Sequence, residues 1–267
     1  MLISRLYLIT MREINAILTI AHRDFLKLLR DRSRILATFI FPFLFIGVLG
    51  GSLQANIDTG YNFLTFVFTG VLGQTVFQST AAGIISLIED RENDFSQEIF
   101  VSPISRYTII FGKIVGESVV ALTQLIGIIF FGIIIGVTFT ISQMITLLPF
   151  FLIACLFGGS FGVFVLSNLK SQRSANQIFP FVIFPQFFLA GIFNPIKQLP
   201  PILLIASRLS PMTYAIDLIR SVFYTGSAAY DKTVLFSIPV NLAVIAVFFT
   251  LFMVSGTYLF IRNERNR

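Results

Sequence analysis

Charged residues are scarce in this sequence, and long stretches contain none. Asp, Glu, Lys and Arg make up 12% of the 267 residues, which is about half their share in soluble domains. The charge-free stretches are 35–57, 59–88, 118–169, 174–196 and 233–261. A helix needs about 20 apolar residues to cross a membrane, so the longest stretch holds two helices, divided by a polar break near 138–144. The sequence therefore predicts an all-α integral membrane protein, a single domain 1–267 with six transmembrane helices.

Catalytic and metal-binding residues are also lacking. The chain has one cysteine, Cys155, and one histidine, His22, which are too few for a Cys/His zinc site or a nucleophile–base pair. The only Gly-Lys pair, Gly112-Lys113, lacks the upstream glycine and the following Ser or Thr of a nucleotide-binding P-loop. We therefore expect this chain by itself to have no enzymatic activity, no metal site and no cofactor.

Lys and Arg are concentrated in alternate loops of the six-span arrangement. Fifteen of the 19 lie in the N-terminal segment, the second and fourth loops and the C-terminal tail. Because basic loops stay in the cytoplasm, both termini are predicted to be cytoplasmic in a multi-pass protein of the cell membrane. The net charge of +6 is spread over loops beside the membrane, which favours contact with membrane lipid over binding of nucleic acid.

Residues 13–33 combine an apolar stripe with a charged face at helical spacing. The stripe runs from Ile14 to Leu28 and includes Phe25. Such a pattern is typical of an amphipathic helix in the membrane interface, although a solvated helix that packs on another domain has the same pattern. The charged face carries Arg23, Asp24, Lys27, Arg30 and Asp31.

The longest loop on the outer side, 195–232, is not uniformly polar. Its apolar run is interrupted by Arg208, Asp217 and Arg220, so it is unsuited to span a membrane. We expect two short helices, broken at Ser210-Pro211, that enter the outer interface as re-entrant helices or cap the helix bundle.

A compact acidic segment, 88–106, follows the second predicted span. Its five carboxylates are among only thirteen in the chain, and they are Glu89, Asp90, Glu92, Asp94 and Glu98. A charge run is usually a solvated loop. A carboxylate metal site is a second reading, but the first three carboxylates cannot all face one point on a helix.

Apolar residues inside the acidic segment favour a third reading, a docking surface for a cytoplasmic partner. Phe100 and its apolar neighbours lie within the polar loop, Pro103 interrupts any helix there, and Ser102 can cap the helix that follows. Apolar surface rimmed by charge is typical of an interface.

Glu117 is the candidate ionisable group inside a predicted span. Carboxylates in spans often relay ions, but Glu117 lies four residues after Lys113. An i, i+4 pair at the membrane interface explains it more simply.

Three motifs, in order along the chain, resemble the permease subunits of type-2 ABC exporters, and most closely the drug-exporting (daunorubicin-resistance) branch. The first is RDFLKLLRDRSR, 23–34, before a proline-bearing first span. The second is the acidic run with Glu98, SPISR at 102–106 and Gly112-Lys113. The third is GIFNPIKQLP, 191–200, followed by LSPMTYAIDLIR, 209–220.

The resemblance implies that a cytoplasmic coupling helix between spans two and three docks on a separate ATPase subunit. Two permease chains, identical or different, and two ATPase subunits would form one transporter, and the ATPase would bind ATP and Mg²⁺. The implied ATPase-coupling residues are Glu89, Asp90, Glu92, Glu98, Phe100, Ser102, Pro103 and Arg106. The interface helix would contribute Arg23, Asp24, Phe25, Arg30 and Asp31, and the extracytoplasmic motif Pro211, Tyr214, Asp217 and Arg220.

The expected function is outward transport of an apolar or amphipathic substrate, either a drug or a lipid-like molecule. Thirty-two phenylalanines and charge-free spans suit such cargo, although phenylalanines that face lipid would give the same composition. Alternatives are a polysaccharide or glycolipid exporter of the same class, an ion-coupled carrier or channel, and a membrane anchor that only recruits a partner.

Overall fold

The computed structural model describes residues 2–31, 36, 40, 42–50, 61–92, 105–169 and 171–265. These residues form helices and no strand, which confirms the predicted all-α class. The α-helices are α1 (Leu2–Arg30), α4 (Phe63–Gly83), α5 (Ile85–Glu92), α7 (Arg106–Ile134), α8 (Ile141–Leu166), α9 (Gln172–Leu189), α10 (Pro201–Leu209), α11 (Pro211–Phe223), α12 (Tyr230–Thr233) and α13 (Ile238–Arg265). A π-helical segment, η1, covers Phe43–Gly50, and a 3-10 turn, η2, covers Ile196–Gln198.

Four helical segments of the described residues are long and apolar enough to cross a membrane. They are Phe63–Asp90, Arg106–Ile134, Ile141–Leu166 and Tyr230–Asn263, and α10 with α11 would be a fifth if this bent pair is one span. The first predicted span, 35–57, lies largely outside the described residues. Helix α9 occupies the place of the fifth predicted span but begins with the polar run QRSANQ. The total of six spans therefore stays a prediction.

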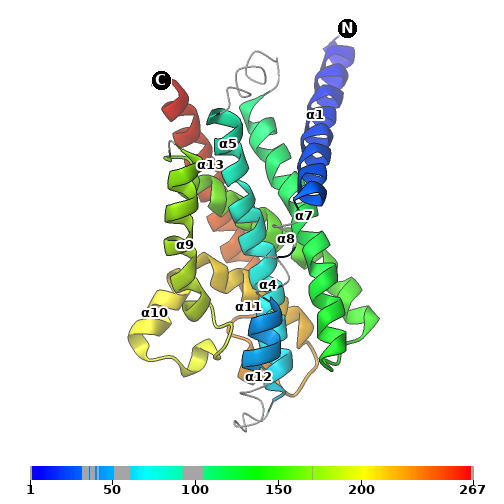
Figure 1. Cartoon of the computed structure of the whole chain (residues 1–267), viewed down its shortest axis with the longest axis vertical. Helices are drawn as coiled ribbons and strands as arrows, with labels where there is room; N and C mark the ends of the chain where they lie inside the picture. The colour runs from blue at the N-terminus through cyan, green and yellow to red at the C-terminus, as the bar shows by residue number, and fades with distance from the viewer. Residues whose placement is uncertain are drawn as a thin grey trace.

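Helix α4 runs through the middle of the bundle. It lies between α7 and α9 in Figure 1, and it also packs against α8 and α11. Nearly all of its side chains are buried. The start of α1 and the end of α13 lie at the same end of the bundle (Figure 1), so the two termini share the end at which α5 stops. We call it the terminal end.

Short polar side chains define where the long helices begin. The hydroxyl of Ser105 accepts a hydrogen bond from the backbone N–H of Thr108 at the start of α7, and Thr140 forms a capping box with Gln143 at the start of α8. Each cap satisfies backbone donors that the first helical turn leaves free. The predicted cap Ser102 lies outside the described residues, and Ser105 caps the described helix.

Glycines allow the central helices to approach closely. A Cβ atom at Gly158 of α8 would lie 2.1 Å from the carbonyl oxygen of Phe77 on α4, and one at Gly162 would lie 2.4 Å from that of Ala81. Gly116 of α7 plays the same part beside α1, since its Cβ would lie 2.9 Å from the Cα of Ala21. Small residues four apart let membrane helices pack backbone to backbone.

Helix α1 covers the predicted interface helix 13–33 as far as Arg30, and Asp31 follows it outside the helix. Part of the predicted stripe packs on α7, because Ala21 and Leu28 are buried, whereas Ile14 and Leu18 remain exposed. One expectation was wrong. Asp24, assigned by helical spacing to the charged outer face, is buried.

The loop 195–232 forms the two short helices that the sequence predicts. Helices α10 and α11 meet at Ser210 with a bend of 89°. Pro211 occupies the first turn of α11, where proline's missing N–H costs nothing. Twelve of the thirteen residues of α11 are buried, and the helix packs against α4, α8 and α13. It is thus an inserted element of the bundle.

Candidate functional site

The predicted coupling segment is described at its two ends. Glu89, Asp90 and Glu92 lie at the end of α5, and Arg106 begins α7. The predicted coupling residues Glu98, Phe100, Ser102 and Pro103 lie outside the described residues. The candidate site therefore consists of the side chains around α5 and α7, the two helices that hold this segment.

Lys113 is the centre of a buried ionic cluster that joins three helices. Its Nζ lies 2.8 Å from Oδ1 of Asp24 on α1 and 3.3 Å from Oδ2 of Asp90 on α5. The side chains of Lys113 and Asp24 are 1% and 2% exposed. One cation of α7 thus binds the predicted interface helix and the predicted coupling segment together.

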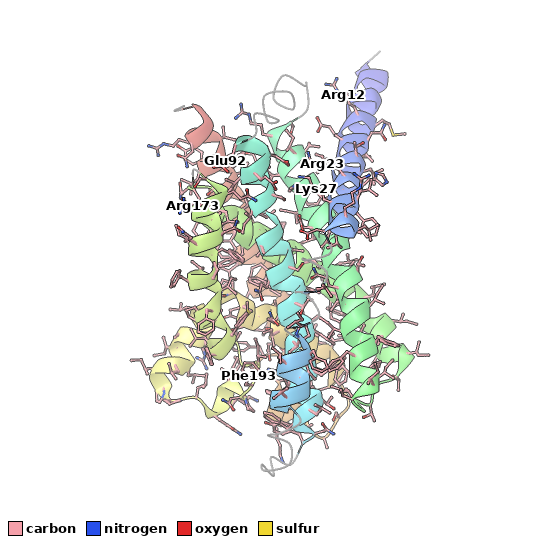
Figure 2. The ribbon with its side chains drawn as sticks, in the orientation of Figure 1. Arg12, Arg23, Lys27, Glu92, Arg173 and Phe193 are labelled. Carbon is pink, nitrogen blue, oxygen red and sulfur yellow. The ribbon has the colours of Figure 1, made fainter. Side chains whose placement is uncertain are left out.

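Two further cations of α1 complete the cluster. Arg23 donates a hydrogen bond from Nη2 to Oδ2 of Asp90, and Nζ of Lys27 lies 3.5 Å from Oδ1 of the same carboxylate. Figure 2 shows Arg23 and Lys27 on α1, at about the level of Glu92 on α5. Burial disfavours the charged guanidinium, but the hydrogen bond and attraction of Asp90, with the attraction of Asp24, raise the pKa of Arg23.

Removal of any one member of this ionic cluster is expected to destabilise the protein. Taking charges out of water is unfavourable, and mutual pairing offsets this only while all partners are present. Loss of one partner leaves an uncompensated charge in the interior. The cluster therefore resists separation of α1, α5 and α7, and these helices are expected to move together.

Other carboxylates fasten the neighbouring ends of the same helices. Oε1 of Glu13 on α1 accepts a hydrogen bond from the backbone N–H of Ser105, with the two atoms 3.3 Å apart. Oε2 of Glu92 accepts one from the backbone N–H of Gln172 at the start of α9, at 3.0 Å. Asp90 and Glu92 of the predicted docking surface thus also hold the segment on the bundle, while Glu89 is partly buried.

Glu117 lies one turn further along α7, at the junction of α4 and α5. It is buried, and its Oε1 lies 3.4 Å from Oγ of Ser86. Its carboxylate occupies the space that Gly83 leaves open, since a Cβ there would lie 2.1 Å from Cδ of Glu117. The proposed pairing with Lys113 stays a prediction, and the carboxylates of the cluster around Lys113 come from α1 and α5.

Arg220 of the third motif is fully buried near the opposite end of the bundle. Its guanidinium donates hydrogen bonds to the carbonyl oxygens of Gly191, at 2.6 Å, Phe66, at 3.1 Å, and Ile192, at 3.2 Å. It also lies 3.7 Å from the ring centroid of Phe66. Arginine suits this position because its planar fork can bind several carbonyls while stacking on an aromatic ring.

Asp217 and Tyr214 fasten the other side of α11. The carboxylate of Asp217 accepts hydrogen bonds from the backbone N–H groups of Leu235 and Phe236, at 2.7 and 2.8 Å, and from the amide of Asn241. The hydroxyl of Tyr214 donates to the carbonyl of Arg208 across the bend, at 2.7 Å. In the structure, Tyr214, Asp217 and Arg220 thus hold α11 in the bundle.

Several of these partners were missed from the sequence. Glu13, Gln186 and Asn241 are polar residues beside or within apolar runs, and this was their only local signal. Oε1 of Gln186 accepts from Oγ of Ser210 and the backbone N–H of Met212. Among the described residues, no group of three His, Cys, Asp or Glu side chains could hold a metal ion.

The sequence of this chain is similar to those of known membrane proteins. A sequence model of the ABC-2 type transporter family matches residues 15–224, which span all three motifs. The chain is also similar to a protein of Cyanophora paradoxa whose name describes it as a candidate transport permease, ycf38. The two are 24% identical over 257 residues, 92% of this chain and 88% of the relative. The ycf38 protein of Porphyra purpurea is 28% identical over 235 residues, 83% of this chain and 78% of the relative.

Proposed function

Because this chain belongs to the ABC-2 type transporter family and is therefore a membrane permease, we propose that it is the membrane half of an ATP-driven exporter. Two such chains, identical or different, would associate with two ATPase subunits that bind ATP and Mg²⁺. The observation that carries the proposal is the buried cluster in which Lys113 holds Asp24 of α1 and Asp90 of α5.

The cluster supplies the mechanical connection that a separate ATPase needs. Movement of the docked ATPase would displace segment 88–106, and the ion pairs at Asp90 would pass this displacement to α1 and α7 together. ATP binding and hydrolysis would then shift the population between inward- and outward-facing states of the permease. The N- and C-termini and segment 88–106 face the cytoplasm of the cell in this proposal.

An apolar or amphipathic substrate fits the bundle better than a charged one. Among the described residues, the buried ionic groups are engaged with protein groups, and this leaves aromatic and aliphatic side chains for contact with cargo; these groups are Asp24, Asp90, Lys113, Glu117, Asp217 and Arg220. We propose a drug or lipid-like molecule, with a polysaccharide or glycolipid as the alternative cargo.

The decisive experiment joins the chain to its ATPase. A tagged chain purified from its own membranes should retain a P-loop ATPase subunit. The pair in liposomes should move a fluorescent amphipathic dye outward only when ATP and Mg²⁺ are supplied on the ATPase side. Absence of any ATPase from the purified complex, together with ATP-independent dye movement, would contradict the proposal.

An ion-coupled carrier is a second candidate because Glu117 is buried in a candidate span. Liposomes that contain this chain alone distinguish the two. A flux driven by a proton or sodium gradient, and lost in Glu117→Gln, would favour the carrier. The exporter predicts no such flux.

A further inference from the structure

Helix α13 is the most outward-facing of the candidate spans. In the most apolar stretch of the span Tyr230–Asn263, which contains most of α13, only 17% is buried. The corresponding share is 72% in the span formed by α4 and α5. Val247, Leu251, Val254 and Tyr258 are exposed along one stripe of the helix, at spacings of three and four residues. This stripe lines a groove of about 920 Å³ together with Tyr107 at the start of α7.

The walls of the groove offer apolar surface. The hydroxyls of Thr250 and Ser255 donate hydrogen bonds to the carbonyl oxygens of Ala246 and Leu251 within α13. Their protons are therefore already used within the helix. From Ala246 to Tyr258 the helix rises about 18 Å. That length is close to one leaflet of a hydrocarbon core about 30 Å thick.

The polar end of the groove points to a lipid headgroup. Tyr107 and Tyr258 both lie near the terminal end, where tyrosines commonly mark the membrane–water boundary. Arg262 is exposed one turn beyond Tyr258 and on the same stripe. An acyl chain along the stripe would therefore place its phosphate beside an arginine.

We propose that this groove, the α13 groove, binds a phospholipid of the leaflet at the terminal end, with its acyl chain on Val247–Tyr258 and its anionic headgroup at Arg262. The site goes beyond the transport function and does not depend on an ATPase. A second copy of this chain is a poorer occupant. Two parallel α13 stripes facing each other would bring two exposed Arg262 side chains close together.

Native mass spectrometry of the purified full-length chain tests the proposal with two added lipids of identical acyl chains. Phosphatidylglycerol, which is anionic, should remain bound more often than phosphatidylcholine. Arg262→Gln should reduce the preference for phosphatidylglycerol about fivefold, the effect of one basic residue at an anionic surface. Leu251→Trp, which places a bulky indole in the middle of the stripe, should reduce binding of both lipids.

Ile126→Trp is the matched control, because Ile126 is exposed on α7 outside the groove. It should bind both lipids as the unmodified chain does, and gel filtration should show all variants to be folded. Equal lipid binding by Leu251→Trp and Ile126→Trp would overturn the proposal. Efficient chain-to-chain disulfide formation in Val254→Cys would also overturn it, since a second copy would then cover the groove.

Discussion

Lys113 and Asp24 form an ion pair of 2.8 Å between α7 and α1, with both side chains almost completely buried. They are 89 residues apart in the sequence. Their pairing attaches a helix at the start of the chain to the span that follows segment 88–106. The strength of this attachment can be measured.

Lys113→Met should destabilise the protein by about 3–5 kcal/mol, because it removes the most deeply buried of the cations that Asp24 and Asp90 share. Thermal unfolding in detergent measures the change, with the exposed Arg173→Gln as a control that should unfold as the unmodified protein does. Lys113→Met combined with Asp24→Asn should cost less than the sum of the two single changes. Additive costs, or a Lys113→Met protein that melts with the control, would show that the pair carries no such attachment.

Phe100→Asp should weaken binding of the ATPase at least about tenfold, because it places a charge in a contact predicted to be apolar. The affinity between the purified subunits gives this value, and the melting temperature of the permease alone should not change. Charge reversal at Glu89 should act in the same direction. Ile141→Asp, at the exposed start of α8 and remote from the coupling segment, is the control. Unchanged affinity in Phe100→Asp would exclude this residue from the docking surface.

Arg220→Lys should destabilise the bundle by at least about 2 kcal/mol despite keeping the charge. Lysine cannot reach three carbonyl oxygens and stack on Phe66 at the same time. Chemical denaturation in mixed micelles tests this, and Arg173→Lys provides the same exchange at an exposed position. If both exchanges change stability equally, the hydrogen bonds from Arg220 to the three carbonyl oxygens do not stabilise the bundle.

Gly158→Ala should cost about 1–3 kcal/mol, because its Cβ would clash with backbone atoms of α4 and force α4 and α8 apart. Gly47→Ala is the matched exchange, since its Cβ would meet nothing nearer than 3.4 Å. Melting temperatures of the two variants should therefore differ. If Gly158→Ala is as stable as Gly47→Ala, the close approach of α4 and α8 at Gly158 does not contribute to stability.

The sequence predicted those parts of the fold that depend on local composition. Charge-free stretches located α7, α8 and α13, and Ser210-Pro211 located the bend between α10 and α11. Burial of Asp24 could not be predicted, because helical spacing assigns a residue to a face but does not say which helix will cover it. The partner of Asp24 lies in a distant segment, and only tertiary packing brings the two together.

The sequence likewise identified several site residues but not the groups that they contact. The acidic run marked the end of α5 as a candidate site, whereas its contacts with α1 and α9 appeared only in three dimensions. Similarly, Asp217 and Arg220 were identified from a resemblance, but the backbone groups that bind them come from α4, the turn after α9 and the segment before α13. Backbone groups have no signature in the sequence.

Glu92 gives the end of α5 a second attachment. Asp90 holds the early part of the chain through Arg23 and Lys113, while Glu92 holds the later part through the first backbone N–H of α9. A force applied to α5 therefore reaches α1 and α7 through Asp90, and α9 through Glu92. Separating α9 from α1 and α7 at this end would require one of these carboxylates to release its partner, so α5 adds to the force needed for such a movement.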